Sequence, residues 1–185
     1  MNIKVLCSSA VLSISLAALS VATFADTAKP TAVDKIDIKQ YAGKWYEIAH
    51  LPMYFQRQCV SDTTAKYSLN ANNTIQVINS CRNKSDQMDQ SVGIAYPDNA
   101  GMSKLKVSFM PKALRWIPFT KGDYWVLRVD PDYKVALVGG PSNKYLWLLS
   151  RTPTIDEATY QSYLETAKQQ GYDLSELIKT PHTSQ

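Results

Sequence analysis

The sequence predicts an all-β fold: an eight-stranded antiparallel up-and-down barrel with one C-terminal α-helix packed outside it. Eight short segments of β-type composition follow one another, each bounded by Pro, Gly, Asn or Asp. The one convincing helical pattern comes after the last of them. A closed barrel leaves no exposed strand edge and encloses an interior, so this order predicts a cavity. A two-sheet sandwich is the alternative, and it would fill that space with side chains.

Length and composition favour a single soluble domain with a substantial core. The 185 residues are 45% hydrophobic, with 4 Trp and 11 Tyr against 2 His. The formal charge of +4 is spread along the chain without a run of five like charges. This pattern argues against nucleic acid as a partner, whereas contact with an anionic membrane surface stays open.

The N-terminus is expected to be a cleaved signal peptide over residues 1–25, followed by a lead-in segment over 26–40. A lysine precedes an apolar run over 5–24, and the triplet 23–25 resembles a signal-peptidase site. Serines within the run argue against the alternative, a membrane anchor. Cys7 lies before the run is complete, so it is not placed to carry a lipid. The mature protein is therefore expected to be exported, periplasmic or cell-envelope associated in a bacterium, and not lipid-anchored.

The first strand begins at Gly43, which frees the backbone, and pairing ends by Pro52. Trp45 at its start suggests an indole that closes the barrel floor; the alternative is an ordinary core tryptophan. Alternation turns Glu47 and Ala49 to the same inward face. For Glu47 the alternative interpretation is a hydrogen-bonded structural carboxylate.

The next two segments, 60–69 and 74–83, flank the turn residues 70–73 and predict a hairpin. Cys59 and Cys81 lie at nearly equal distances from this turn. An oxidising compartment and an even cysteine count after cleavage predict a disulfide between them. A catalytic or metal-binding thiol, the alternative, lacks a third polar partner nearby.

The register that joins the two cysteines also pairs Thr63 with Val77 and Ala65 with Ile75. Odd-numbered residues therefore face inward on both strands. Further strands are predicted over 88–96, 103–110, 122–129, 134–139 and 144–150.

The helix is predicted from the capping-box sequence over 154–157 to a C-terminal cap at Gly171. Its apolar face carries Tyr160, Tyr163, Leu164 and Ala167. A short last strand is expected over 174–178. The barrel with its helix thus spans 41–180, and a loose tail is expected over 181–185.

Three sequence blocks resemble the signature of the lipocalins. They are Gly43-x-Trp45-Tyr46-Glu47-Ile48-Ala49, Asp130-Pro131-Asp132-Tyr133 and Tyr145-Leu146-Trp147-Leu148-Leu149-Ser150-Arg151-Thr152-Pro153-Thr154. They occur in lipocalin order and spacing, and the likeness covers about 34–178. The residues in these blocks most resemble those of bacterial outer-membrane lipocalins and of their apolipoprotein D-like and plant temperature-induced relatives. The resemblance implies an eight-stranded calyx that binds hydrophobic molecules, with Arg151 packing against Trp45 at the closed end beside Gly43.

The resemblance bears on two further points. Bacterial lipocalins of this kind are commonly lipoproteins, and this chain lacks the cysteine in the position that a lipid anchor requires. On the fourth strand, hydrophobicity predicts that Val92 and Ile94 face inward, whereas the resemblance favours Gly93 and Ala95.

Up-and-down topology places the loops 51–58, 83–87, 111–121 and 140–143 around the barrel mouth. The 111–121 segment is long for a hairpin connection and mixes apolar with basic side chains: Leu114, Trp116, Ile117 and Phe119 with Lys112 and Arg115. An apolar patch rimmed by positive charge favours peripheral contact with an anionic membrane. A lid or a dimer surface is the alternative, and both monomer and homodimer stay open.

The predicted function is binding and carriage or storage of a small hydrophobic ligand, a fatty acid or lysophospholipid, without a cofactor or metal. No H-E-x-x-H, G-x-S-x-G or C-x-x-C motif is present, so no enzyme is predicted. The expected ligand-binding residues are Glu47, Ala49, Ala65, Ile75, Val77, Val107, Phe109, Tyr124, Val126, Tyr145 and Trp147. The alternatives are a lipocalin-fold enzyme acting on a lipid or isoprenoid through Glu47 or Arg128, and a haem or tetrapyrrole binder with His50 as ligand.

Overall fold

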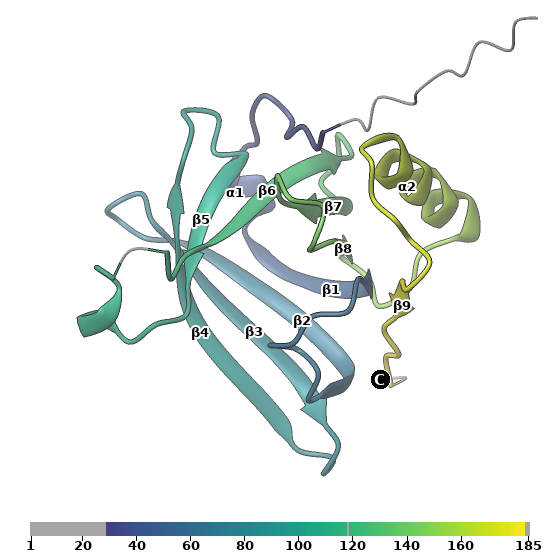
Figure 1. The fold of residues 1–185 in the computed structure, drawn as a ribbon, viewed down its shortest axis with the longest axis horizontal. Coiled ribbons are helices and arrows are strands. Elements are labelled where there is room, and N and C mark those ends of the chain that lie inside the picture. The colour runs from purple at the N-terminus through teal and green to yellow at the C-terminus, as the bar shows by residue number, and fades with distance from the viewer. Residues whose placement is uncertain (1–28, 118, 184–185) are drawn as a thin grey trace, which may run out of the picture.

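A computed structural model describes residues 29–117 and 119–183, and the expected signal peptide lies outside this part of the chain. The sheet order is β2-β3-β4-β5-β6-β7-β8-β1-β9, and an added pairing of β1 with β2 closes the first eight strands into an antiparallel barrel (Figure 1). The strands are β1 Gly43–His50, β2 Cys59–Leu69, β3 Ile75–Asn83, β4 Met88–Pro97, β5 Lys104–Ser108, β6 Gly122–Val129, β7 Val135–Gly139, β8 Trp147–Ser150 and β9 Ile178–Lys179. The predicted fold class is therefore confirmed.

In the part of the chain that the structure describes, the barrel is accompanied by three helical segments: α1 Ile38–Tyr41, the short 3-10 helix η1 Lys112–Leu114, and α2 Glu157–Gln169. Asp156 caps α2 by accepting a hydrogen bond from the Thr159 backbone N–H. The cap is thus Asp156, whereas the capping-box pattern starts two residues earlier. Within the described ranges, no helix is long and apolar enough to cross a membrane.

Apolar side chains form two clusters on the two faces of the barrel wall. The interior cluster is Ile36, Tyr41, Trp45, Ala65, Tyr67, Ile75, Val77, Ala95, Leu105, Val126, Ala136, Val138 and Leu149. The outer cluster joins the wall to Tyr160, Tyr163 and Ala167 of α2, which lies outside the barrel in Figure 1. Alternate residues of one strand enter different clusters, as the period of two requires.

The β2–β3 register differs from the predicted one, although the predicted inward face is right. Val77 pairs with Tyr67 instead of Thr63, and Ile75 pairs with Leu69. The register shifts between Cys59 and Thr64, so the disulfide joins Cys59 to Cys81 diagonally and is a poor marker of direct pairing. The predicted and the observed register differ by an even number of residues, so odd-numbered side chains still face inward.

On β4 the large hydrophobic residues Val92 and Ile94 do not face the interior, which corrects the prediction from hydrophobicity. Gly93 and Ala95 are buried, whereas Val92 is 48% exposed. A Cβ atom at Gly93 would lie only 2.8 Å from the Phe109 ring. The inner wall therefore requires a glycine here, which agrees with the resemblance and not with the hydrophobicity of the strand.

Candidate functional site

The closed end of the barrel is built by the three residues expected there. Trp45 is fully buried, and its Nε1–H donates to the Tyr41 carbonyl oxygen at 2.8 Å. The Arg151 guanidinium lies 3.9 Å from the centre of the indole ring. Gly43 has a φ of +99°, and a Cβ atom there would lie 3.3 Å from the guanidinium. Backbone freedom at Gly43 therefore lets the guanidinium pack under the floor.

A layer of tyrosines lies directly above the floor. The Tyr41 ring is 5.0 Å from the Trp45 ring and 5.6 Å from the Tyr67 ring, between centroids. Tyr124 reaches across from β6, and its hydroxyl lies 2.7 Å from that of Tyr41 and 2.8 Å from that of Tyr67. Burial raises the pKa of all three hydroxyls. Tyr67 was missed by sequence reasoning, although its odd number on β2 carries the inward signal.

Most of the expected wall residues face the barrel interior. Ala65, Ile75, Val77 and Val126 are buried there, whereas Val107, Tyr124 and Trp147 contact the same cluster and stay partly exposed. Partial exposure of these inward-facing side chains shows that solvent-accessible space reaches part of the inner wall above the tyrosine layer.

Aromatic rings continue from this interior to the surface. The Trp147 and Tyr145 ring centroids are 6.2 Å apart, and Tyr145 is 5.5 Å from Phe55 in the 51–58 loop. Phe55 is 45% exposed. Phe109 is equally exposed and lies beside Gly93. These residues mark the open side of the interior.

Ala49 does not face the interior as alternation predicted. The β1–β8 register shifts between Glu47 and Ala49, which indicates a β-bulge at Ile48. Ala49 therefore pairs with Leu148 and joins the outer cluster under α2. Glu47 is still inward, and the same shift brings His50 to its side, with His50 Nδ1 2.9 Å from Glu47 Oε1.

The buried Glu47 carboxylate is held by side chains from three directions. Gln56 Nε2 donates to both carboxylate oxygens, at 2.9 and 2.7 Å, and the Thr180 hydroxyl donates to Oε1 at 2.6 Å. Trp147 Nε1 donates to Gln56 Oε1 at 3.4 Å, which ties the network to the inner wall. These contacts match the structural-carboxylate interpretation of Glu47.

Residues 180–183 of the C-terminal segment lie between β1 and β2 and form hydrogen bonds there, whereas a loose tail was expected from residue 181. The Thr180 backbone N–H donates to the Ile48 carbonyl oxygen at 3.0 Å. On the other side, the Asp62 N–H donates to the Pro181 carbonyl oxygen at 2.9 Å. His182 Nε2–H donates to the Glu47 carbonyl oxygen at 2.8 Å. The segment therefore fills the gap where β1 and β2 diverge.

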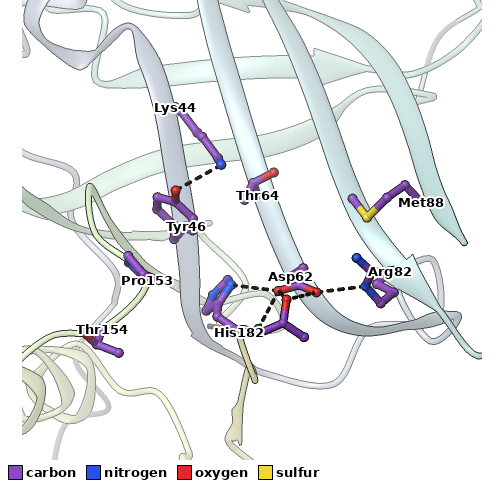
Figure 2. Close-up of a pocket in the computed structure, with 10 residues that line it drawn as sticks. Lys44, Tyr46, Asp62, Thr64, Arg82, Met88, Pro153, Thr154 and His182 are labelled. Atoms are coloured by element: carbon purple, nitrogen blue, oxygen red, sulfur yellow. Dashed lines mark hydrogen bonds and ion pairs between the residues drawn. The ribbon is translucent and has the colours of Figure 1, made fainter. Parts of the chain in front are cut away.

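A cavity of about 380 Å³ lies beside this segment on the outer face of β1, β2 and β3 (Figure 2). Figure 2 shows Asp62 between His182 and Arg82, and Arg82 Nε lies 3.0 Å from Asp62 Oδ2. Burial alone would raise the Asp62 pKa, but hydrogen bonds from Thr183, Arg82 and Ser61 outweigh it and lower this pKa to about 2. Asp62 and Arg82 are thus paired with each other, whereas the Lys44 ammonium group in the same cavity donates to the Tyr46 hydroxyl at 3.1 Å.

Two basic residues of the 111–121 segment, which was expected at the mouth, lie beside the outer wall. Lys112 and Arg115 line a cavity of about 520 Å³ with Ile94 and Tyr96, beside the turn between β2 and β3. Leu114, Ile117 and Phe119 lie on the same segment, with Phe119 fully exposed and Ile117 partly buried. Across residues 29–117 and 119–183, no group of three His, Cys, Asp or Glu side chains is placed to hold a metal ion.

Comparison with known proteins identifies the family. A family model described as a lipocalin-like domain matches residues 36–182. The chain belongs to the lipocalin family. It is 46% identical to temperature-induced lipocalin-1 of Arabidopsis thaliana over 154 residues, 82% of each chain. It is 42% identical to outer membrane lipoprotein Blc of Escherichia coli strain K12 over 150 residues, 80% of each.

Solved structures agree with this lipocalin fold. The cockroach allergen Per a 4 superposes with a TM-score of 0.63 at 18% identity, over 85% of this chain and 97% of that one. Insecticyanin from the tobacco hornworm gives a TM-score of 0.61 at 21% identity, over 84% and 85%. Lipocalins are mostly binding or transport proteins, and membership of the family supports binding of small hydrophobic ligands.

Proposed function

We propose that this lipocalin binds and carries or stores a fatty acid or a lysophospholipid inside its barrel. The observation that carries the proposal is the apolar inner wall, which stays partly exposed at Val107, Tyr124 and Trp147 above a sealed floor. Burial of an acyl chain contributes about 0.8 kcal/mol per CH₂ group. A space of this kind therefore favours a long apolar chain, and the tyrosine layer limits how deep it reaches.

The open side of the interior supports a polar head group near the surface. The run of rings from Trp147 through Tyr145 to Phe55 leads from the interior to the exposed 51–58 loop. A ligand that passes along these rings buries its chain and leaves its head group in water. We propose that the predicted wall residues other than Ala49 contact the chain.

The two alternative functions find less support in the contacts of their candidate residues. Arg128 lies on the outside of the barrel, where it donates to Ser162 and Thr166 of α2. Glu47 and His50 are held by Gln56, Thr180 and each other. A catalytic acid or base, or an axial haem ligand, would first have to leave these partners.

Native mass spectrometry of the protein from its own host, followed by extraction, tests the proposal. We expect one fatty acid or lysophospholipid per barrel. The Val107→Trp substitution should fill the hollow part of the interior and abolish fatty-acid binding, because Val107 faces it. Val92→Trp, on the exposed outer face of β4, is the matched control and should bind normally. Equal binding by both variants would place the ligand outside the barrel.

Export to the periplasm or cell envelope is part of the proposal and rests on the N-terminal pattern. We expect the mature chain from the native host to begin at Asp26, after the predicted cleavage. Intact-mass analysis of that chain measures both the start and any attached lipid. A chain that retains residues 1–25 would contradict the proposal.

A further inference from the structure

The tyrosine layer holds one hydroxyl proton more than its own hydrogen bonds use. Tyr124 donates to Tyr67, with 2.8 Å between the oxygens. A tyrosine hydroxyl has a single proton, so the Tyr41 hydroxyl, 2.7 Å from that of Tyr124, must donate to Tyr124. The Tyr67 proton remains. Over residues 29–117 and 119–183, the Tyr67 hydroxyl takes part in the bond from Tyr124 and donates no hydrogen bond of its own.

The Tyr67 hydroxyl that carries this proton belongs to a buried side chain. Tyr67 is only 4% exposed, and its ring lies between those of Tyr41 and Tyr124, at 5.6 and 5.8 Å. A buried donor without an acceptor is costly, so such donors have partners in folded proteins. Tyr124 is inward-facing and yet partly exposed. Accessible space therefore reaches Tyr124, whose hydroxyl is bonded to that of Tyr67.

The environment of the Tyr67 hydroxyl determines whether a charged or an uncharged acceptor fits beside it. Burial raises the pKa of Tyr67, and the Glu47 carboxylate raises it further, against the opposing effects of Tyr124 and Arg151. An environment that keeps a phenol neutral also penalises a carboxylate brought to the same place. The fitting acceptor is therefore an uncharged oxygen.

We propose that the Tyr67 hydroxyl binds the buried end of the ligand, and that this end carries a neutral oxygen acceptor such as a carbonyl or hydroxyl group. The inference rests on the proposed function, because it requires the ligand to occupy the barrel. It adds a selectivity that an apolar wall alone lacks. An unsubstituted acyl chain leaves the Tyr67 proton without a partner, whereas an oxygenated chain end satisfies it.

Calorimetric titration tests the inference. The ligands are fatty acids and oxo derivatives of the same chain length, in which the carbon next to the terminal methyl group is a ketone. The ketone oxygen accepts hydrogen bonds without donating them. For wild-type protein we expect the oxo derivative to bind more tightly than its parent at the length that reaches the tyrosine layer. Tyr67→Phe should weaken binding of that derivative about fivefold, the net effect of one neutral hydrogen bond. Its affinity for the parent acid should be unchanged or higher.

Tyr41→Phe is the matched control, because it removes a hydroxyl from the same chain of hydrogen bonds and leaves the Tyr67 proton in place. The preference for the oxo derivative should survive in this variant, and circular dichroism verifies that both variants fold. If Tyr67→Phe fails to fold, the length-dependent preference of the wild type decides alone. The inference is overturned if every oxo derivative binds wild type more weakly than its parent, or if both variants lose the preference equally. Failure of the parent acids to bind at all would instead overturn the proposed function.

Discussion

The Arg151 guanidinium stacks on the Trp45 indole at 3.9 Å and donates to backbone carbonyl oxygens at the start of β1 and in the segment that leads into it. Its Nη atoms lie 2.6 Å from the Gln40 oxygen, 2.9 Å from that of Ala42 and 2.8 Å from that of Lys44. Trp45 in turn donates to the Tyr41 oxygen. The two side chains therefore hold the same stretch of backbone against the end of the barrel.

Trp45 and Arg151 stabilise the same stretch of backbone, so loss of one side chain should reduce the stabilisation that the other contributes. Trp45→Ala is expected to lower the free energy of unfolding by about 3–5 kcal/mol, as a large core truncation does. Arg151→Ala should be strongly non-additive with it, because the residues are in direct contact. Urea unfolding of the two single variants and the double variant measures the coupling. Trp45→Ala combined with Lys168→Ala on α2 is the control and should be additive; additivity at the floor would contradict the shared role.

The Cys59–Cys81 disulfide should stabilise the β2–β3 hairpin through the loop that it closes. The cysteines are 22 residues apart in sequence, and their Cα atoms lie 5.5 Å from each other. Closing such a loop contributes about 3 kcal/mol. The double variant Cys59→Ser with Cys81→Ser should therefore melt at a lower temperature than wild type. Reductant should lower the melting temperature of wild type and leave that of the double variant unchanged. Free thiols in native exported protein would contradict the bond.

The barrel was predictable because strand composition, turn residues and alternation all point the same way. Alternation alone placed Ala65, Ile75 and Val77 on the inner wall, where the structure has them. It failed for Ala49, because the bulge at Ile48 inserts one residue and inverts the faces beyond it. A second register shift, between Val126 and Arg128, turns Arg128 outward in the same way. A bulge of this kind has no compositional signature in these strands.

The parts of the site that sequence reasoning missed depend on contacts between distant segments. Tyr124 was expected on the inner wall, but its contact with Tyr41 was not, because the two residues are 83 positions apart and meet only inside the closed barrel. Pro181 and His182 resemble a polar tail, yet their backbone and ring bond to β2 and β1. The composition of a segment does not reveal where the segment lies in the fold. It therefore could not show that these residues fill a gap between two strands.

Asp62 should make stability depend on pH in the acidic range. Its pKa is lowered from 3.8 to about 2 in the folded protein. Its contribution is therefore fully present above about pH 4 and is lost as the pH falls towards 2. We expect roughly 1–2 kcal/mol, allowing for solvent screening of this partly exposed group. Urea unfolding of wild type and Asp62→Asn between pH 2 and 7 measures it, and the difference between them should shrink only below about pH 4.

Deletion of residues 181–185 is the control for this pH effect. Thr183 donates to Asp62 through its backbone N–H and its hydroxyl, at 2.8 and 2.9 Å. When the deletion is made in both wild type and Asp62→Asn, these bonds are absent from both chains. Much of the acid-range difference in stability between the two chains should then disappear. A full difference between the truncated chains would assign the effect to Arg82 and Ser61, which keep their bonds to Asp62.

The 111–121 segment is proposed to contact anionic membranes. Trp116 is 78% exposed and Phe119 fully exposed, so both apolar side chains project into solvent. Lys112 is exposed, and Arg115 is held by its Nε–H, which donates to the Met110 carbonyl oxygen at 2.9 Å. Apolar tips beside basic groups fit the interface of an anionic bilayer. Because Lys112 and Arg115 lie beside Ile94 and Tyr96 on the outer wall, we expect the segment to dock the protein without covering the ligand.

Trp116→Ala combined with Lys112→Glu and Arg115→Glu should therefore slow lipid transfer from anionic vesicles and leave affinity for a soluble fatty acid nearly unchanged. Met88→Ala with Lys66→Glu and Lys168→Glu changes the charge equally at other exposed positions and is the control. Raised salt should slow transfer by wild type and the control but have little effect on the docking variant, because the attraction of basic groups to anionic lipid is screened. Equal loss of affinity in both assays would make the segment a lid, and conversion of a dimer to a monomer would make it a subunit interface. Unaltered transfer by the docking variant would remove the membrane contact.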